Sequence, residues 1–354
     1  MGPTDNMERP IRLLVLRFSA IGDVALTLPV LRGLLEINSN LKITLVTRPM
    51  FTSFFRDVER LELFPADFKK KYSGIRGLIR LFRDLSGSGH YDYIIDLHDV
   101  IRSRFLCSLF RFRGKPVYRV DKGRHEKNDL IRGRIFHPLK HTTERYLDVF
   151  RQLPVKTWIP HDTYFNYDPV SVNKIPERYL KEPGVKWIGI APFAKHVLKT
   201  WPLENMKSLM RMLGENTPMK FFIFGGGTRE LAAIDRMAKE FPGAVNVAKE
   251  LDFNGELDVM KHLDAMISMD SANMHMASLA GVHTITIWGA THPFAGFAAY
   301  HNNNALDIQI SREELDCRPC SVFGKGTCRR GDLACLNWLT PEKVYQEIQR
   351  AGVL

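Results

Sequence analysis

The chain has 354 residues, of which 45% are hydrophobic and 25% charged. This composition is typical of a folded globular protein and excludes a disordered or fibrous one. The length exceeds the roughly 100–200 residues of an ordinary domain, so we expect two domains. Lysine and arginine (50) outnumber aspartate and glutamate (39), and the net charge of +11 favours an anionic partner.

The excess positive charge lies in the first half of the chain. Residues 1–170 contain 29 basic and 19 acidic residues, whereas residues 171–354 contain 21 and 20. Most of the excess falls between Ile101 and Arg134, where eleven basic residues face three acidic ones. This block is compatible with a nucleic-acid face, with an acceptor that carries carboxylates or phosphates, and with a solvated surface. No nucleic-acid recognition motif accompanies it.

We expect a cytoplasmic protein. No apolar run approaches the roughly 18 residues that cross a bilayer, and the polar segment Met1–Pro10 does not resemble a secretion signal. The odd number of cysteines suits a reducing compartment.

Four of the five cysteines crowd near the end of the chain, at Cys317, Cys320, Cys328 and Cys335. Four thiolates within nineteen residues could hold a structural metal ion such as zinc. The second pair is separated by six residues rather than by the two typical of zinc ribbons, so free thiols and disulfide pairs are the alternatives.

The first half begins with a β-α-β pattern. The apolar pattern predicts a buried strand over Ile11–Arg17 and a second strand over Lys42–Thr47. Between them, apolar residues recur at helical spacing over Val24–Glu36. This unit predicts a parallel sheet with a right-handed crossover. Tyr91–Leu97 predicts another strand, and His141–Leu153 a helix.

A stretch with several prolines and weak periodicity then separates two halves, each of which alternates predicted strands and helices. After it the alternation restarts, with predicted strands at Lys186–Ala191, Lys220–Phe224, Ala265–Ser268 and His283–Trp288, and helices from Leu203, from Glu230, over Ala272–Leu279 and over Pro341–Ala351. We therefore predict an α/β protein with two doubly wound parallel sheets: a domain over 1–165, a linker over 166–184, a domain over 185–340 and a terminal helix over 341–354. Ligands gather at the carboxyl ends of such strands, so we expect the site in the cleft between the sheets.

The loop Phe18–Asp23 joins the first strand to the first helix and is the first candidate site. Gly22 allows close backbone approach, and the free amides of the helix start attract an anion. The Asp23 carboxylate could take a proton from a substrate hydroxyl. The alternative is that Ser19 or Asp23 only caps the helix.

A second candidate is the strand-to-helix junction Met269–His275. Ser271 and the amides behind it could hold a diphosphate, for which the small Ala272 leaves room. Asp270 is expected to cap or orient the loop, since like charges repel. His275 falls on the same helix face as Ser271, although a packed histidine explains it equally well.

Two further loops of the second half carry polar groups. The glycines at 225–227 are not the spaced dinucleotide fingerprint, and a tight turn explains them as well as nucleotide binding does. Glu230 behind them could accept hydrogen bonds from ribose hydroxyls, or could be a helix-start acid. Lys199 could neutralise charge on a phosphate leaving group.

The segment Arg17–Leu31, together with Ser268–His275 and Trp288–Pro293, resembles the signatures of the lipopolysaccharide heptosyltransferase family, glycosyltransferase family 9. The resemblance implies a GT-B fold, in which two Rossmann-like domains face across a cleft. It also implies inverting transfer of a sugar from an ADP-sugar, with the acceptor on the amino-terminal domain and the donor on the carboxyl-terminal domain.

The resemblance also implies roles for the matched residues. Asp23 corresponds to the proposed general base, Lys199 to a contact of the donor phosphates and Glu230 to a ribose contact. The remaining donor positions are Asp270, Ser271, Ala272, His275, Thr291 and His292. The acceptor positions are Ser19, Gly22, Arg102, Ser103 and Arg124, which would face a phosphorylated or Kdo-bearing inner core.

His292 stands where many relatives have an acid, so heptose as the donor sugar follows from the family and not from the residues. The expected partners are an ADP-sugar and a lipopolysaccharide core or lipid A precursor at the inner face of the inner membrane, without nucleic acid. No cofactor or catalytic metal is expected. The rival functions are a nonenzymatic polyanion-binding module and a nucleotide-dependent oxidoreductase, which the missing spaced-glycine fingerprint disfavours.

Overall fold

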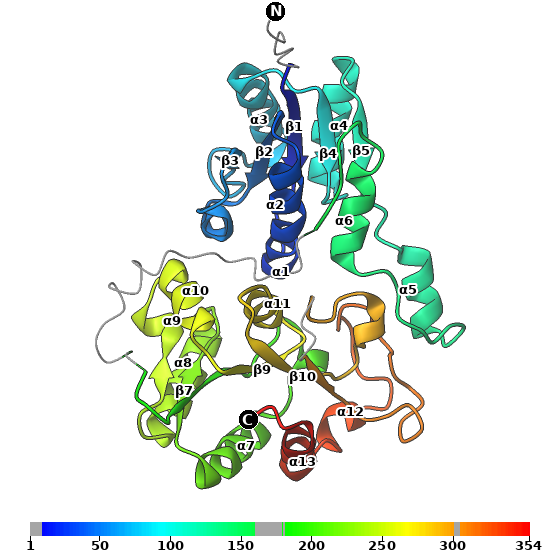
Figure 1. Ribbon diagram of the computed structural model, residues 1–354. Coiled ribbons are helices and arrows are strands. Elements are labelled where there is room, and N and C mark those ends of the chain that lie inside the picture. Colours follow the sequence, from blue (N-terminus) through cyan, green and yellow to red (C-terminus); the bar gives the residue numbers. More distant parts are fainter. Residues whose placement is uncertain (1–8, 160–178, 180, 301–304) are drawn as a thin grey trace, which may run out of the picture. The chain divides into compact units, whose positions relative to one another are not determined.

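The computed structural model describes residues 9–159, 179, 181–300 and 305–354, and the chain forms two compact units (Figure 1). Unit 1 comprises Met1–Lys122 and Thr142–His161, and unit 2 comprises Gly123–His141 and Asp162–Leu354. No helix within the described ranges is long and apolar enough to cross a membrane.

Unit 1 is built on five parallel strands in the order β3-β2-β1-β4-β5. Leu16 at the end of β1 pairs with Val46 on one side and with Asp96 on the other, so two strand ends meet beside it. The central strand β1 buries Leu13–Leu16 completely, and such a continuous apolar run is recognisable from sequence. The strands are β1 (Ile11–Leu16), β2 (Leu41–Thr47), β3 (Leu61–Pro65), β4 (Tyr93–Asp96) and β5 (Val117–Arg119).

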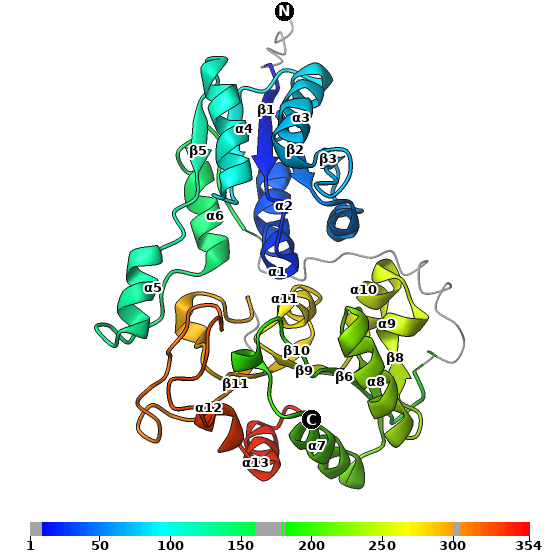
Figure 2. The ribbon, with the colours of Figure 1, turned by 180° about the vertical axis from the view of Figure 1, so that it is seen from behind.

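Helices cover both faces of this sheet. Helices α3 and α4 lie on the face seen in Figure 2, and α2 and α6 pack together on the other face. The predicted helix over 24–36 is two helices, because Pro29 lacks an N–H and suits only the first turn of the second one. The helices of unit 1 are α1 (Ile21–Ala25), α2 (Leu28–Ile37), α3 (Gly74–Ser88), α4 (Ile101–Phe112) and α6 (Thr142–Phe150), with a 3-10 helix η1 (Pro49–Phe55).

Unit 2 is built on six parallel strands in the order β11-β10-β9-β6-β7-β8. The strands are β6 (Lys186–Ala191), β7 (Met219–Ile223), β8 (Val245–Asn246), β9 (Ala265–Met269), β10 (His283–Ile287) and β11 (Leu306–Ile308). The helices are α5 (Arg124–Ile131), α7 (Leu203–Asn216), α8 (Thr228–Glu240), α9 (Val247–Glu250), α10 (Phe253–Lys261), α11 (Ala272–Leu279), α12 (Ala334–Asn337) and α13 (Pro341–Ala351), with 3-10 helices η4 (Val197–Lys199) and η5 (Pro293–Ala295).

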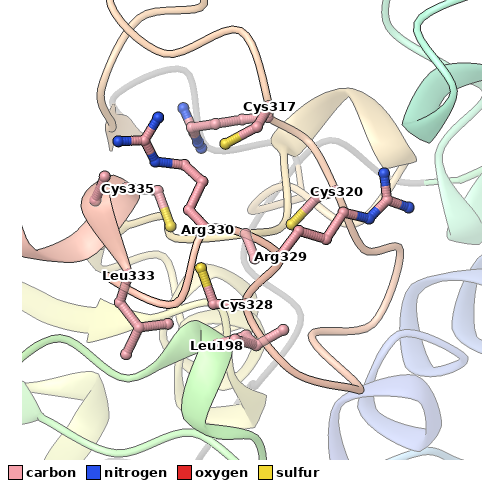
Figure 3. A pocket seen from close by; sticks show the side chains of 11 residues that line it. Leu198, Cys317, Cys320, Cys328, Arg329, Arg330, Leu333 and Cys335 are labelled. Atoms are coloured by element: carbon pink, nitrogen blue, oxygen red, sulfur yellow. The ribbon is translucent and has the colours of Figure 1, made fainter.

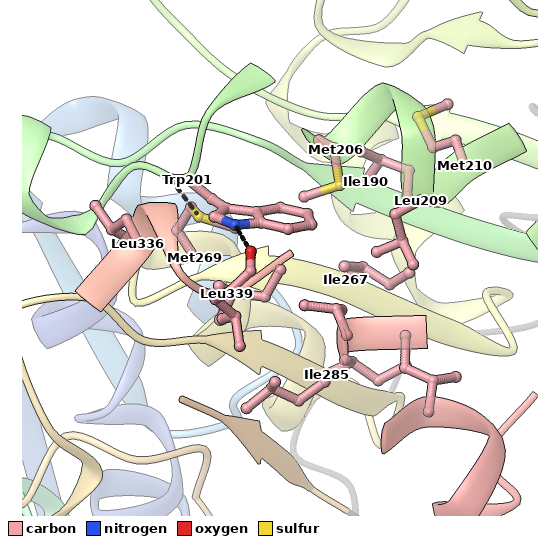
Figure 4. Close-up of a cluster of buried hydrophobic side chains, with 14 of the residues drawn as sticks. Ile190, Trp201, Met206, Leu209, Met210, Ile267, Met269, Ile285, Leu336 and Leu339 are labelled. Atoms are coloured by element: carbon pink, nitrogen blue, oxygen red, sulfur yellow. Dashed lines mark hydrogen bonds between the residues drawn. The ribbon is translucent and has the colours of Figure 1, made fainter. Parts of the chain in front are cut away.

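The chain segment that follows η4 packs into the core of unit 2. The indole of Trp201 is buried, and its Nε1 donates a hydrogen bond of 2.8 Å to the carbonyl oxygen of Leu339 (Figure 4). The Trp201 amide lies 3.3 Å from the sulfur of Met269, the last residue of β9. The Met269 side chain therefore joins the end of β9 to the backbone two residues after η4.

The basic segment between residues 101 and 134 divides between the two units. Residues up to Lys122 belong to unit 1, whereas Gly123–His141 pack with unit 2. Leu130 and Leu139 bury their side chains with Ala295, and the Leu139 amide donates to the Phe294 carbonyl at 2.9 Å. The sequence-based division placed this segment in the first domain, because apolar contacts distant along the chain are not visible in its local pattern. The expected linker, 166–184, lies mostly outside the described residues.

Candidate active site

In each unit the strand order reverses at a point where polar loops follow neighbouring strands. The reversal lies between β1 and β4 in unit 1, and between β6 and β9 in unit 2. Such a switch point opens a crevice at the carboxyl ends of the strands, which is where ligands bind open α/β sheets. Each unit therefore carries a candidate site of its own.

In unit 1, Asp23 is paired with a buried arginine. Its Oδ2 atom lies 2.7 Å from Nη2 of Arg17, whose side chain is 5% exposed, whereas the Asp23 side chain is 33% exposed. Oδ2 also accepts a long hydrogen bond of 3.3 Å from the amide of Ala20, just before α1. Asp23 thus supports the helix start, as the capping alternative expected, and still presents a charged oxygen to solvent.

The position of Arg17 is fixed by contacts on several sides. It donates to the carbonyl oxygen of Leu97 at 2.6 Å, and its guanidinium lies 5.6 Å from the centre of the Tyr146 ring. Burial lowers the pKa of Arg17, but Asp23 and its other neighbours outweigh this effect and raise the pKa overall. Burial also raises the pKa of Tyr146, which stays a neutral phenol. Asp23 therefore has a permanent cation behind it.

His98 is a residue of the candidate site in unit 1 that the sequence did not reveal. It follows β4, and its Nε2 lies 3.4 Å from Oγ of Ser19, with its ring edge-on to Phe18. Burial, followed by the charge of Arg17, lowers the pKa of His98 to about 3, so the imidazole is neutral. Only the pairing of β4 with β1 brings it beside Ser19, and no local motif encodes that pairing.

The residues expected to contact the acceptor differ in burial. Gly22 is buried in α1, and Ser103 is fully buried, donating to Asp96 at 3.1 Å and accepting from the amide of Val100 at 3.0 Å. Ser103 thus holds the start of α4 and has no surface to offer an acceptor. Arg102 is exposed, with its guanidinium 5.8 Å from the Phe68 ring centre. Arg124 is exposed at the start of α5, in unit 2.

In unit 2, Lys199 and Asp270 form an ion pair of 2.8 Å between side chains that are 14% and 8% exposed. Lys199 ends η4 after β6, and Asp270 follows β9. The Oδ2 atom of Asp270 also accepts a hydrogen bond of 2.8 Å from the hydroxyl of the buried Thr291. The loops after three neighbouring strands are therefore joined at one carboxylate.

The start of α11 lies beside this pair. Ser271 is the N-cap residue, but its hydroxyl makes no capping bond and has no hydrogen-bond partner among the described residues, although it is buried. Ala272 opens the helix and His275 is buried one turn further along. An unpaired buried hydroxyl next to free helix amides is suited to binding an anionic group.

Glu230 lies in the first turn of α8, after β7. Its Oε2 accepts a hydrogen bond of 2.9 Å from the amide of Gly226, so the carboxylate closes the glycine turn. Glu230 thus stands at the helix start, as the helix-start alternative expected.

The loop after β10 is held by two residues. Nδ1 of His292 accepts from the amide of Phe294 at 3.1 Å, and burial followed by the charge of Arg318 lowers the pKa of His292 to about 4. Arg318 is buried and donates to the carbonyls of Gly289 at 2.8 Å and Thr291 at 3.0 Å. Arg318 was missed because its partners in this loop, Gly289 and Thr291, are 29 and 27 residues away in sequence.

The four terminal cysteines line a cavity of about 20 Å³ with Leu198 and Arg318 (Figure 3). All four are free thiols, so the disulfide alternative is not realised. Within the described part of the chain, no group of three or more histidine, cysteine, aspartate or glutamate side chains is arranged to hold a metal ion.

Comparison with known proteins identifies the fold. A family 9 glycosyltransferase from Veillonella parvula has a TM-score of 0.74 at 20% identity, covering 98% of both chains. The Escherichia coli heptosyltransferase WaaC, solved with ADP, has a TM-score of 0.69 at 19% identity, covering 96% of this chain and all of that one. The two parallel-sheet units are those of a GT-B glycosyltransferase, which confirms the predicted fold class.

The sequence comparisons agree. Residues 78–325 match the family model described as glycosyltransferase family 9 (heptosyltransferase). The lipopolysaccharide core heptosyltransferase OpsX of Haemophilus influenzae is 21% identical, covering 98% of this chain and 96% of its own. Lipopolysaccharide heptosyltransferase 1 of Escherichia coli is 22% identical, covering 86% and 95%. The chain belongs to glycosyltransferase family 9 and is a glycosyltransferase, so the binding-module and oxidoreductase alternatives are not favoured.

Proposed function

We propose that this protein transfers heptose from ADP-heptose, with inversion, to an acidic or phosphorylated lipopolysaccharide core acceptor. The names of its relatives support the reaction, since they are lipopolysaccharide heptosyltransferases. Two structures of WaaC, one with ADP and one with ADP-2-deoxy-2-fluoro heptose, support the donor. The place of action is the cytoplasmic face of the inner membrane.

In this reaction Asp23 is the general base. It takes the proton of the acceptor hydroxyl while that oxygen forms a bond to the anomeric carbon of the sugar. Arg17 stabilises the charged form of the carboxylate, with which it shares a contact of 2.7 Å. Ser19 and the exposed Arg102 and Arg124 are the proposed acceptor contacts, since guanidinium groups bind phosphates and carboxylates well.

The bond from the anomeric carbon to the diphosphate breaks, and its electron pair leaves with ADP. Lys199, the Ser271 hydroxyl and the amides at the start of α11 stabilise the negative charge that develops on the departing ADP. Preorganised donors aimed at such a charge make a large contribution to lowering the activation barrier. Asp270, bonded to Thr291, keeps Lys199 in place beside the start of α11. Glu230 accepts from the ribose, while Ala272, His275 and His292 shape the donor pocket.

The observation that carries the proposal is the one-third exposed Asp23 carboxylate on a buried guanidinium at the end of a central strand. The test replaces Asp23 with Asn, which keeps the side-chain shape and removes the base. Turnover of ADP-heptose should fall about 10²–10⁴-fold, while calorimetry should find ADP binding almost unchanged.

The matched control is Asp57→Asn, which also removes a carboxylate paired with a buried arginine, Arg32, at 2.9 Å. This variant should keep full turnover. Full activity of Asp23→Asn would overturn the assignment of the base. A panel of ADP-sugars and UDP-sugars with defined core acceptors tests the substrates, and absence of transfer from ADP-heptose would overturn the proposed donor.

A further inference from the structure

Helix α4 exposes a large apolar stripe opposite the face that it buries. Ser103, Leu106, Cys107 and Phe110 pack inward on the sheet of unit 1. At 3.6 residues per turn, Ile101, Ser108 and Phe112 lie on the opposite side. Phe105, between them, is partly buried against the core of unit 1. Ile101 is 87% exposed and Phe112 is 94% exposed. One face of α4 thus packs in the core, and the other presents two large apolar side chains to solvent.

Arginines flank this stripe on both sides. Arg104 and Arg111 border one edge, and Arg102 and Arg113 border the other, all of them exposed. No acidic residue occurs in α4. The arrangement of an apolar centre between basic borders is the pattern of a helix that lies in a membrane interface.

The neighbouring helix α3 extends the same surface. It presents the exposed Arg76, Arg80 and Arg83, and its Ile75 is 68% exposed. Its one acidic residue, Asp84, forms an ion pair of 2.8 Å with Lys71 outside the helix. We call the exposed faces of α3 and α4 the α3–α4 surface.

The two helices pack against each other, side by side on the face of unit 1 seen in Figure 2. Phe82 of α3 and Phe110 of α4 stack edge to face with ring centres 4.8 Å apart. The guanidinium of Arg113 lies 5.4 Å from the Phe82 ring centre, so it also bridges the helices. The surface is therefore preformed and needs no folding on binding.

We propose that the α3–α4 surface docks unit 1 on a bilayer that contains anionic phospholipid. Ile101 and Phe112 enter the boundary between headgroups and acyl chains, and the arginines contact lipid phosphates. A soluble polyanion would contact only the arginines and would leave Ile101 and Phe112 exposed to water. A second copy of the same surface would bring rows of arginines together, which repel. The proposal rests on the proposed function only in that a lipid-linked acceptor gives such docking a purpose.

The test is flotation of the full chain with vesicles of phosphatidylcholine, either alone or mixed with phosphatidylglycerol. The chain should bind the mixed vesicles and release them as salt is raised. Phe112→Ser should weaken binding about tenfold, since the side chain then buries no apolar area. Arg111→Gln should weaken it about fivefold, the effect of one basic residue near an anionic surface. Both side chains are exposed, so neither change disturbs the core.

The controls are matched in chemistry. Met50→Ser removes an apolar side chain of unit 1 that is 51% exposed, and Arg350→Gln removes an exposed arginine of α13. Both should bind vesicles like the unmodified chain. Phe112→Ser should keep full transfer to a water-soluble core oligosaccharide and lose transfer to acceptor embedded in vesicles.

The proposal would be overturned by equal binding to both kinds of vesicle, by unchanged vesicle binding of Phe112→Ser, or by a Phe112-dependent dimer in analytical ultracentrifugation. Duplex DNA that binds the chain more tightly than the mixed vesicles do would also overturn it. Vesicle binding requires no sugar transfer, and Asp23→Asn should bind vesicles normally. Failure of docking is therefore distinguishable from failure of the proposed reaction.

Discussion

The guanidinium of Arg17 lies 2.7 Å from the carboxylate of Asp23, and it is buried while the carboxylate is one-third exposed. This pair differs from a surface salt bridge because Arg17 cannot swing away: the Leu97 carbonyl and the Tyr146 ring hold it. The cation therefore orients Asp23 as well as stabilising its charge.

We expect Arg17→Met to lower kcat about 10²-fold, because small displacements of a catalytic group cost that much. The KM for the donor should change little. The control is Arg32→Met, which removes a similarly buried guanidinium paired with Asp57. Steady-state kinetics should show a kcat loss in the first variant alone. An equal loss in both would mean that Arg17 acts only through stability.

Gly324 should matter because it leaves room for Lys199. A Cβ atom at this position would lie 2.4 Å from Cγ and 2.5 Å from Cδ of Lys199. Gly324→Ala should push Lys199 away from Asp270 and lower kcat/KM for ADP-heptose about tenfold.

The control for this prediction is Gly326→Ala. Both glycines have positive φ angles, +72° and +99°, but a Cβ on Gly326 would meet nothing within 4 Å. Alanine at either position adopts a positive φ that glycine favours, and only the Gly324 variant also meets Lys199, so only the first should affect the kinetics. Equal kinetic losses would show that strain, not contact with Lys199, is responsible.

The cysteines should differ in reactivity. Burial raises the pKa of Cys328, but hydrogen bonds from the backbone of Leu333 and its neighbours outweigh this and lower the pKa overall. Burial raises the pKa of Cys335 to about 11 and that of Cys107 to about 12. Because the thiolate is the reactive form, iodoacetamide should modify Cys328 first. Peptide mass mapping over time checks this, and modification of Cys107 or Cys335 at the same rate would contradict it.

His98 should make the protein less stable in acid. Burial lowers its pKa from 6.5 to about 3 in the folded chain. Between these values the unfolded chain binds more protons, so the stabilisation is complete above pH 6.5 and is lost as the pH falls toward 3. At about pH 5 the loss should be about 2 kcal/mol in the free energy of unfolding.

Urea unfolding at about pH 5 and about pH 7 measures this loss. His98→Gln should reduce the difference between the two conditions, whereas His90→Gln, at a half-exposed side chain, should leave it unchanged. An unaltered difference in His98→Gln would show that another group carries the acid sensitivity.

Local patterns along the chain were sufficient to predict the fold class and the family. Buried parallel strands are continuous apolar runs, and Ile11–Leu16 and Lys186–Ala191 were visible for that reason. Asp23 and Lys199 were identified as candidates because each follows such a strand within a recognisable motif.

The tertiary structure decided how those residues are charged, paired and exposed. The guanidinium of Arg17 behind Asp23 and the neutral His98 beside Ser19 depend on burial and on the pairing of β1 with β4. Arg318 and the packing of residues 123–141 with unit 2 depend on contacts distant in sequence. Periodicity and spacing describe one element at a time, whereas burial and the fields between charges arise only when separate elements meet.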